Sequence, residues 1–320
     1  MRSITPTHLA LGLSAVLLPG LLVGAVRGEA KADEVTIPDK TQVKLLDAGD
    51  NPRQKLRYRY EPGQKERLAM IMDMAMEMDM GGRSHSQQIP AITMAGLIEI
   101  TEKTKAGYRQ RFKFDNISVA DDGPAAPGTR QRMRRMMKSM EGFSGTALMT
   151  RRGIVKEANF EAPPNAAPQM RQQLNRTKRM VKNVGTIMPK QPIGEGGRWR
   201  VTMPLDNGQF RLKQIATYSL RTLDGDRAIV DVRIKQAAPK QTYKNRGQKI
   251  HLNALNTEGT GRITLDMTKL VPESALRMET RINQSVNNRA VEVTMNADIT
   301  IRPGDNAAKS DGEAGAQQDK

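Results

Sequence analysis

Cysteine is absent from this 320-residue chain, which also has only three histidines, one tryptophan, five tyrosines and five phenylalanines. Without cysteine the chain can form no disulfide, thiolate metal site, cysteine nucleophile or lipid-anchored lipobox. The shortage of aromatic rings disfavours the base stacking by which proteins hold single-stranded nucleic acid. The sequence contains no G-x-S-x-G, H-E-x-x-H, P-loop or G-x-G-x-x-G motif. We therefore predict a protein that is not an enzyme, with no catalytic residue, cofactor or metal site.

The N-terminal segment predicts export. Arg2 precedes an apolar run over 9–23 that glycine and proline interrupt, and small residues offer cleavage sites after Ala25 or Ala32. This is the pattern of a secretory signal peptide, which we place at 1–32. An uncleaved anchor is the alternative, because the apolar run approaches the roughly 18 residues that a membrane span needs. We expect a bacterial periplasmic or extracellular protein that is soluble after cleavage.

Positive charge is in excess, with 51 Lys and Arg against 34 Asp and Glu and a net charge of +17. A basic surface attracts nucleic acid or anionic membranes. Export would remove the chain from cytoplasmic nucleic acid, so we predict no nucleic-acid partner. An anionic envelope surface, such as lipid head groups, is the partner that the charge favours.

Alternation of apolar and polar residues dominates the remaining chain and is typical of strands. Tight-turn residues at 224–226 and 287–288 separate pairs of these segments and favour antiparallel pairing. We expect a single domain over 54–303, after a polar lead-in over 33–53 and before a disordered tail over 304–320. The predicted strands are 54–60, 67–80, 91–101, 108–119, 142–150, 153–160, 197–203, 209–223, 227–236, 249–255, 259–267, 274–286 and 289–301.

Two segments have helical periodicity instead. The first, 129–140, has four methionines on one side and basic residues on the other, and the second, 166–184, repeats this arrangement with other apolar residues. Long strands with two inserted helices indicate an α+β fold. We predict a large curved antiparallel sheet, or a half-open β-barrel, of about 11 to 13 strands covered by the two helices.

Methionine is abundant, with 20 residues, and part of it forms a stripe. Every even position from 68 to 80 is Leu or Met, whereas Asp73, Glu77 and Asp79 occupy odd positions. A strand places the even side chains on one face, while a helix would scatter them. The stripe therefore predicts one long strand with an apolar face formed by Met70, Met72, Met74, Met76, Met78 and Met80.

Three roles for the stripe are open. Methionine fills irregular cores, so the stripe can be a packed face, and its adaptable side chain also suits the lining of an apolar cavity. Thioethers are in addition soft ligands for Cu(I). The copper hypothesis has little support from other residues, because only His85 and His251 follow the expected signal peptide.

Three short segments carry a resemblance to known proteins: LRYRYEPG at 56–63, MP at 188–189 with PIGEGGRW at 192–199, and GTGRITLD at 259–266. With them the chain resembles an uncharacterised family of exported bacterial β-rich proteins and, more distantly, the LolA-like carriers of lipoproteins. The resemblance covers about residues 54–302. It implies a half-open antiparallel barrel whose concave side is capped by helices and can hold an acyl chain. It transfers no specific site residue.

We predict an exported, non-enzymatic protein that holds a lipid, an acyl chain or a lipid-modified partner such as a lipoprotein in an apolar groove. The alternative is an envelope structural or interaction protein with a filled core, in which no cavity exceeds about 300 Å³. The methionine stripe would line the groove, together with four helical methionines: Met133, Met136, Met137 and Met140. Basic side chains would contact acidic head groups: Arg134, Arg135, Arg179 and Lys182.

Overall fold

The computed structural model describes residues 35–79, 84–121, 125, 127–138, 140–163, 185–206, 210–245, 248–286 and 289–304. Within these residues the chain forms one 13-stranded sheet and one helix, α1 (Pro127–Lys138). The strands are β1 (Gln42–Asp47), β2 (Lys65–Asp79), β3 (Ser84–Thr104), β4 (Gly107–Val119), β5 (Ser144–Met149), β6 (Val155–Glu161), β7 (Arg198–Asp206), β8 (Arg211–Asp224), β9 (Arg227–Ala238), β10 (Gln241–Asn245), β11 (Gln248–Asp266), β12 (Glu273–Val286) and β13 (Arg289–Pro303).

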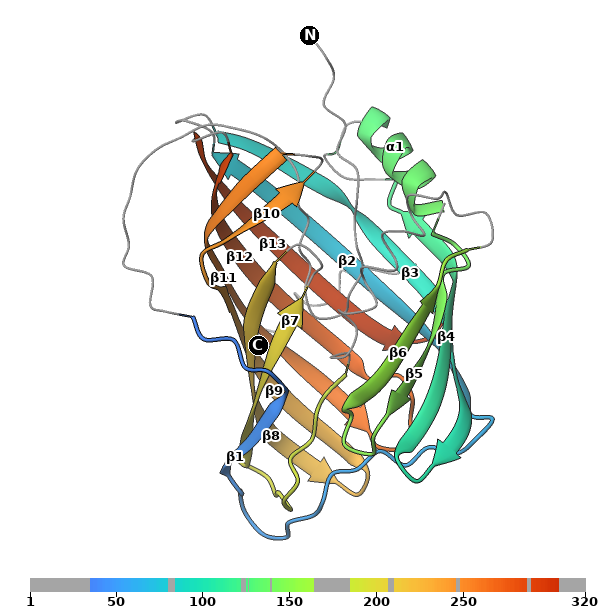
Figure 1. Cartoon of the computed structure of the whole chain (residues 1–320). Helices are drawn as coiled ribbons and strands as arrows, with labels where there is room; N and C mark the ends of the chain where they lie inside the picture. Colours follow the sequence, from blue (N-terminus) through green and yellow to red (C-terminus); the bar gives the residue numbers. More distant parts are fainter. Residues whose placement is uncertain are drawn as a thin grey trace, which may run out of the picture.

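The strands form a curved open sheet in the order β1-β7-β8-β9-β11-β12-β13-β2-β3-β4-β5-β6, and β10 pairs with β11 away from this path (Figure 1). Every strand pair with a recorded register is antiparallel, which confirms the predicted sheet type. Strand β2 lies between β13 and β3. The methionine stripe, although near the N-terminus, therefore lies in the middle of the sheet.

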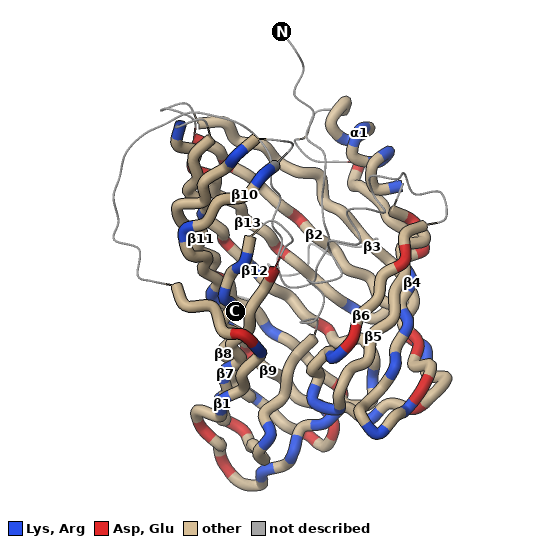
Figure 2. Tube along the Cα trace, in the orientation of Figure 1, with Lys and Arg blue, Asp and Glu red and all other residues tan. Residues whose placement is uncertain are grey.

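Side-chain alternation gives the sheet an apolar inner face and a polar outer face. On β12, Met278, Ile282 and Val286 are buried, whereas Arg277 and Arg281 are exposed. The same alternation recurs along the other long strands, and the buried side chains join in one apolar cluster. Figure 2 shows that charged residues occur along most strands. Each strand thus contributes one face to the interior and one to the outside.

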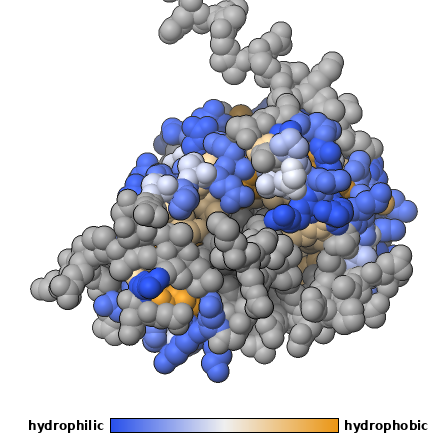
Figure 3. Space-filling view, turned by 90° about the horizontal axis from the view of Figure 1, so that it is seen from above, coloured by the Kyte–Doolittle hydropathy of each residue, from blue (hydrophilic) through white to orange (hydrophobic). Residues whose placement is uncertain are grey.

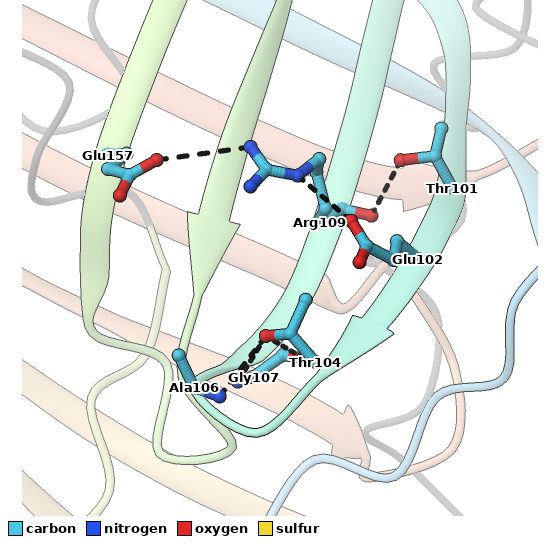
Figure 4. A network of polar contacts seen from close by, with 7 residues as sticks. All are labelled: Thr101, Glu102, Thr104, Ala106, Gly107, Arg109 and Glu157. Carbon is cyan, nitrogen blue, oxygen red and sulfur yellow. Dashed lines mark hydrogen bonds and ion pairs between the residues drawn. The ribbon is translucent and has the colours of Figure 1, made fainter.

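Ion pairs join neighbouring strands on the outer face. Asp231 of β9 accepts hydrogen bonds from Arg221 on β8 at 2.5 Å and from Arg262 on β11 at 2.9 Å. The bond from Arg262, aided by that from Arg221, lowers the pKa of Asp231 although partial burial raises it. At the other side of the sheet, Arg109 on β4 contacts Glu102 at 3.3 Å and Glu157 at 3.9 Å (Figure 4).

Irregular chain closes the lower end of the curved sheet in Figure 1, where the segment between β1 and β2 runs beneath the strand ends. Its backbone bonds reach several elements in turn: Asp50 N to Glu195 O, Tyr58 N to Arg151 O, Arg59 N to Met267 O and Gly63 N to Ile100 O, at 2.7 to 2.8 Å. Leu56, Tyr58 and Tyr60 are 1%, 6% and 3% exposed and face inward. We call residues 54–63 the floor segment.

The predicted strand over 54–60 is therefore wrong. Inward and outward side chains do alternate there, but the backbone bonds go to different elements and not to one neighbouring strand. The predicted strands 249–255 and 259–267 are one strand, β11. The glycines do not interrupt β11. At Gly261 the side chain of Leu276 on β12 occupies the space that a side chain would need, since a Cβ there would lie 2.4 Å from Leu276 Cδ2.

Two strands escaped the sequence analysis. β1 lies in the predicted polar lead-in and is the short edge strand beside β7. β10 is five residues long and pairs only with β11. Neither segment is long enough to show a clear alternation.

The first predicted helix, 129–140, is confirmed by α1, which begins at a proline, a residue favoured in the first helical turn. The second predicted helix, 166–184, lies outside the described residues, as do the signal peptide at 1–32 and residues 305–320 of the predicted tail. The fold is thus mostly antiparallel sheet with one short helix in the part described. None of the helical segments described there has the length and apolarity to cross a membrane.

Shortening a stripe methionine should destabilise the protein. Met72 is 3% exposed in the interior, so Met72→Ala removes buried contacts and should lower the free energy of unfolding by about 2–5 kcal/mol. The neighbouring Asp73→Ala lies on the outer face and should change it by less than about 0.5 kcal/mol. Urea denaturation measures both. Equal effects of the two substitutions would contradict the assignment of faces.

Candidate functional site

The curved sheet encloses a cavity of about 210 Å³. We call this cavity the lumen. Its wall draws inward-facing side chains from most strands, so it is the interior of the curved sheet and not a surface cleft. Apolar residues predominate in the wall: Leu68, Ile98, Met149, Met203, Val232, Ile234, Ile263, Leu265, Leu270, Val271, Pro272, Leu276, Met278, Ile299 and Ile301.

The lumen is small and extends along β12. Its wall includes Ser274, Leu276 and Met278 of β12, which span about 13 Å at the usual rise of about 3.3 Å per residue. Its volume is below the roughly 300–1,000 Å³ of pockets for drug-sized ligands. A small cavity that extends along a strand suits a slender chain. Seen from above, apolar side chains show between the hydrophilic residues of the upper rim (Figure 3).

Tyrosines form the lower wall of the lumen. The rings of Tyr58 and Tyr60 stack at 5.4 Å, and Tyr60 contacts Tyr108 at 5.1 Å. Tyr58 Oη donates to Thr186 O at 3.2 Å and Tyr108 Oη donates to Tyr58 O at 3.1 Å. Burial raises the pKa of Tyr58 and of Tyr60 well above the ordinary value. These hydroxyls therefore stay protonated and the wall stays neutral.

Among the described residues, acidic and basic groups line the lumen only at the turn between β11 and β12. Asp266 and Lys269 belong to the wall there, and Lys269 is exposed. Asp266 accepts hydrogen bonds from Thr268 N at 2.9 Å and Oγ1 at 2.6 Å; burial raises its pKa, but these bonds lower it further. Glu66 holds the same turn by accepting from Leu270 N at 2.9 Å. The carboxylate of Asp266 thus stabilises the turn through these hydrogen bonds.

The even-numbered methionines of β2 lie on the inner face, as predicted, but they are packed. Met70, Met72, Met74 and Met78 are 2%, 3%, 4% and 7% exposed, and Met76 is half-buried. None of these five belongs to the wall of the lumen, whereas Leu68, at the start of the same stripe, does. Met80 lies outside the described residues. The packed-face interpretation therefore accounts for the methionines of β2 that the structure describes.

The helical methionines also pack against the core. Met137 is fully buried, and Met133, Met136 and Met140 are half-buried against the apolar cluster. Helix α1, which carries the first three, contacts β4, Met140 follows the end of the helix, and the wall of the lumen contains none of the four.

The predicted head-group residues divide into two pairs. Arg134 and Arg135 are exposed on α1, and Arg134 forms an ion pair with Asp121. Arg179 and Lys182 lie outside the described residues. For all four residues, contact with a lipid head group stays a prediction.

A second group of basic residues lies at the closed end. Arg57 donates to Pro189 O at 2.9 Å and Lys190 O at 2.7 Å, and Arg152 Nε donates to Met188 O at 3.0 Å. Burial lowers the pKa of both guanidinium groups, and the charge of Arg152 adds to the effect on Arg57. These bonds tie the floor segment to the chain that precedes β7.

Sequence reasoning missed the tyrosine wall and the polar groups inside the lumen. In the sequence, Tyr58 and Tyr60 alternate with Arg57 and Arg59. This alternation is also typical of a strand, so it predicts a strand and not a wall of tyrosines. The copper hypothesis for methionine stays a prediction. Among the residues that the structure describes, no three His, Asp or Glu side chains are grouped to hold a metal ion.

Comparisons with known proteins add little. No protein-family model matches the chain, and no curated protein does so. The COG4313 outer membrane channel from Pseudomonas putida F1 is 7% identical, with a TM-score of 0.26 over 78% of this chain and 98% of the channel. A loop-deletion mutant of OmpT, an outer membrane protein of Vibrio cholerae, is 8% identical, with a TM-score of 0.21 over 76% of this chain and all of the mutant. Similarity at these scores carries no argument about fold or function.

Tyr243 gives a pH test of the inner face. It donates to Gln284 Oε1 at 2.8 Å, and burial raises its pKa to about 12 from 10.0. Between these values the unfolded chain loses the tyrosine proton and the folded chain keeps it, so stability falls as the pH rises. Tyr243→Phe should cost about 1–3 kcal/mol at pH 8. That cost should shrink by about 1.4 kcal/mol per pH unit above about pH 10.

Urea denaturation of both proteins at pH 8, 10 and 11 measures the difference. A cost that stays constant over this range would show that Tyr243 ionises alike in the folded and unfolded chains.

Proposed function

We propose that the protein is an exported, non-enzymatic carrier that holds one slender apolar chain, such as an acyl chain, in the lumen. The observation that carries the proposal is the distribution of polarity. The sheet encloses a small apolar cavity on its concave face and carries charges and ion pairs on its convex face.

The convex face does not suit contact with lipid, because a strand face that lies against acyl chains is apolar. Here that face carries ion pairs between strands, such as Arg277 with Asp298 at 2.8 Å and Lys235 with Glu258 at 3.0 Å. Leu46 is the one large hydrophobic side chain that is exposed among the described residues, at 37%. The apolar surface that a lipid would need therefore lies inside.

The predicted groove changes place in this proposal. The methionines of β2 fill the core. The acyl chain would bind between the tyrosine wall and the inner faces of β8, β9, β11, β12 and β13. Export to the bacterial envelope and the resemblance to LolA-like carriers are parts of the same proposal. Arg134 and Arg135 on α1 are the exposed residues that we propose for contact with an anionic head group or membrane.

A filled structural or interaction protein is the second candidate. It is favoured by the close packing of the methionine stripe and by a lumen smaller than about 300 Å³. The two functions differ in whether a ligand enters the lumen.

A substitution that fills the lumen separates them. Ile234 on β9 faces the lumen, and Ile234→Trp should block it, lowering the affinity for methyl parinarate, a neutral fluorescent acyl ester, by ~10-fold or more. Arg233→Trp, the next residue on the outer face, is the matched control and should bind as the wild type does. Fluorescence titration measures both, and thermal melting checks that each variant folds. If the wild type neither binds the ester nor carries lipid in native mass spectra, the filled structural protein is correct.

A further inference from the structure

A row of polar side chains crosses the apolar inner face. Gln214 on β8 pairs with Gln236 on β9, Gln236 with Thr257 on β11, and Thr257 with Thr280 on β12. Their exposures are 5%, 4%, 1% and 5%. Methionines lie at both ends of the row, Met203 beside Gln214 and Met295 beside Thr280. Buried polar groups are costly unless they are hydrogen-bonded, so each member of the row needs a partner.

Three members of the row have strong partners. The hydroxyls of Thr257 and Thr280 bond to each other at 2.9 Å. Gln236 Nε2 donates to Gln214 Oε1 at 2.7 Å. Within the described part of the chain, the amide nitrogen of Gln214 donates only to Met203 Sδ, at 3.8 Å. A thioether is a weak acceptor, and an amide NH₂ has two hydrogens to donate. Gln214 thus keeps unused donor capacity at a buried position.

Gln214 is the member of this row that belongs to the wall of the lumen. Its wall neighbours are apolar or aromatic: Met203 on β7, Tyr218 on β8 and Val232 and Ile234 on β9. The lumen therefore presents an amide donor within an apolar surface. An acceptor oxygen on a ligand would complete the hydrogen bonding of the row.

The charge of that acceptor follows from the rest of the wall. Among the residues that the structure describes, its one cation is Lys269, in the turn between β11 and β12, and Asp266 of the same turn contributes a negative charge. Gln214 lies near the start of β8, whereas Asp266 is level with the end of β8, because Asp266 pairs with Arg227 and Arg227 pairs with Asp224. A carboxylate or phosphate at Gln214 would be buried without a counter-ion, which is expensive. A neutral carbonyl has no such cost.

We propose that the ligand is an esterified or amidated acyl chain whose carbonyl oxygen accepts a hydrogen bond from Gln214 Nε2, in preference to a free fatty acid. This inference rests on the proposed function and adds the chemical class of the ligand. The chain extends along β12 toward the tyrosine wall, and the ester group sits at the polar row. Specificity comes from one hydrogen bond and from a surrounding wall that, in the residues described, carries no cation beside Gln214.

Competition against methyl parinarate at pH 7 tests the inference on the full chain. Methyl decanoate should displace the probe ~10-fold or more better than decanoic acid, because decanoic acid is a carboxylate at pH 7 and must bury that charge or take up a proton. Gln214→Leu should lower the affinity for methyl decanoate by about 2- to 10-fold, the usual range for the loss of one hydrogen bond. It should leave decanoic acid nearly unchanged. Thr217→Leu, on the outer face of the same strand, should behave as the wild type does.

Gln214→Leu also removes the acceptor of Gln236 Nε2. The double variant Gln214→Leu/Gln236→Leu removes both amides of the pair, and it should show the same loss of ester preference if the single variant does not fold. Equal affinities for the ester and the acid in the wild type would overturn the inference, as would an ester preference that both variants leave as large as in the wild type. In these cases the proposed function stands. Failure of methyl parinarate to bind the wild type would overturn the proposed function and the inference with it.

Discussion

The structure depends on one constraint: a single large sheet has an apolar face that it must bury, and it buries that face against other parts of the same sheet. Only one helix, α1, covers it in the part of the chain that the structure describes, and that helix contacts β4. A sheet with one apolar face and few helices to cover it must curve until its own strands face each other. Antiparallel pairing of β2 with β13 makes this possible, since it joins the N-terminal strands to the C-terminal ones. The apolar faces of both groups then meet in one interior.

Packing across this interior is uneven, and the candidate site results from that unevenness. Long flexible methionines on β2 fill the middle of the sheet, where they are almost fully buried. Aromatic rings fill other parts, such as Trp199, which stacks on Tyr218 at 5.1 Å and donates to Ile187 O at 2.8 Å. Between these filled regions the branched residues of β9, β11 and β12 leave the lumen.

Much of the fold follows from the period-two pattern. The pattern placed the long strands, their antiparallel pairing and the inner face of β2, because alternation depends only on local geometry. The floor segment has the same alternation without being a strand. Leu56, Tyr58 and Tyr60 alternate as a strand does, but their backbone groups bond to separate elements far apart in the sequence. No local pattern distinguishes an extended segment with many partners from one with a single partner.

The sequence by itself determined which side chains turn inward, because each strand has one apolar side. Only the tertiary structure decided which of them are packed and which surround space. The methionine stripe was expected to line the groove, yet its described methionines lie in the core, and the lumen is bounded by tyrosines and branched residues from distant segments. The polar row arose in the same way. Gln214 and Gln236 are 22 positions apart, and the register of β8 against β9 brings them together. Register and packing depend on all strands at once, so residue spacing alone could not reveal them.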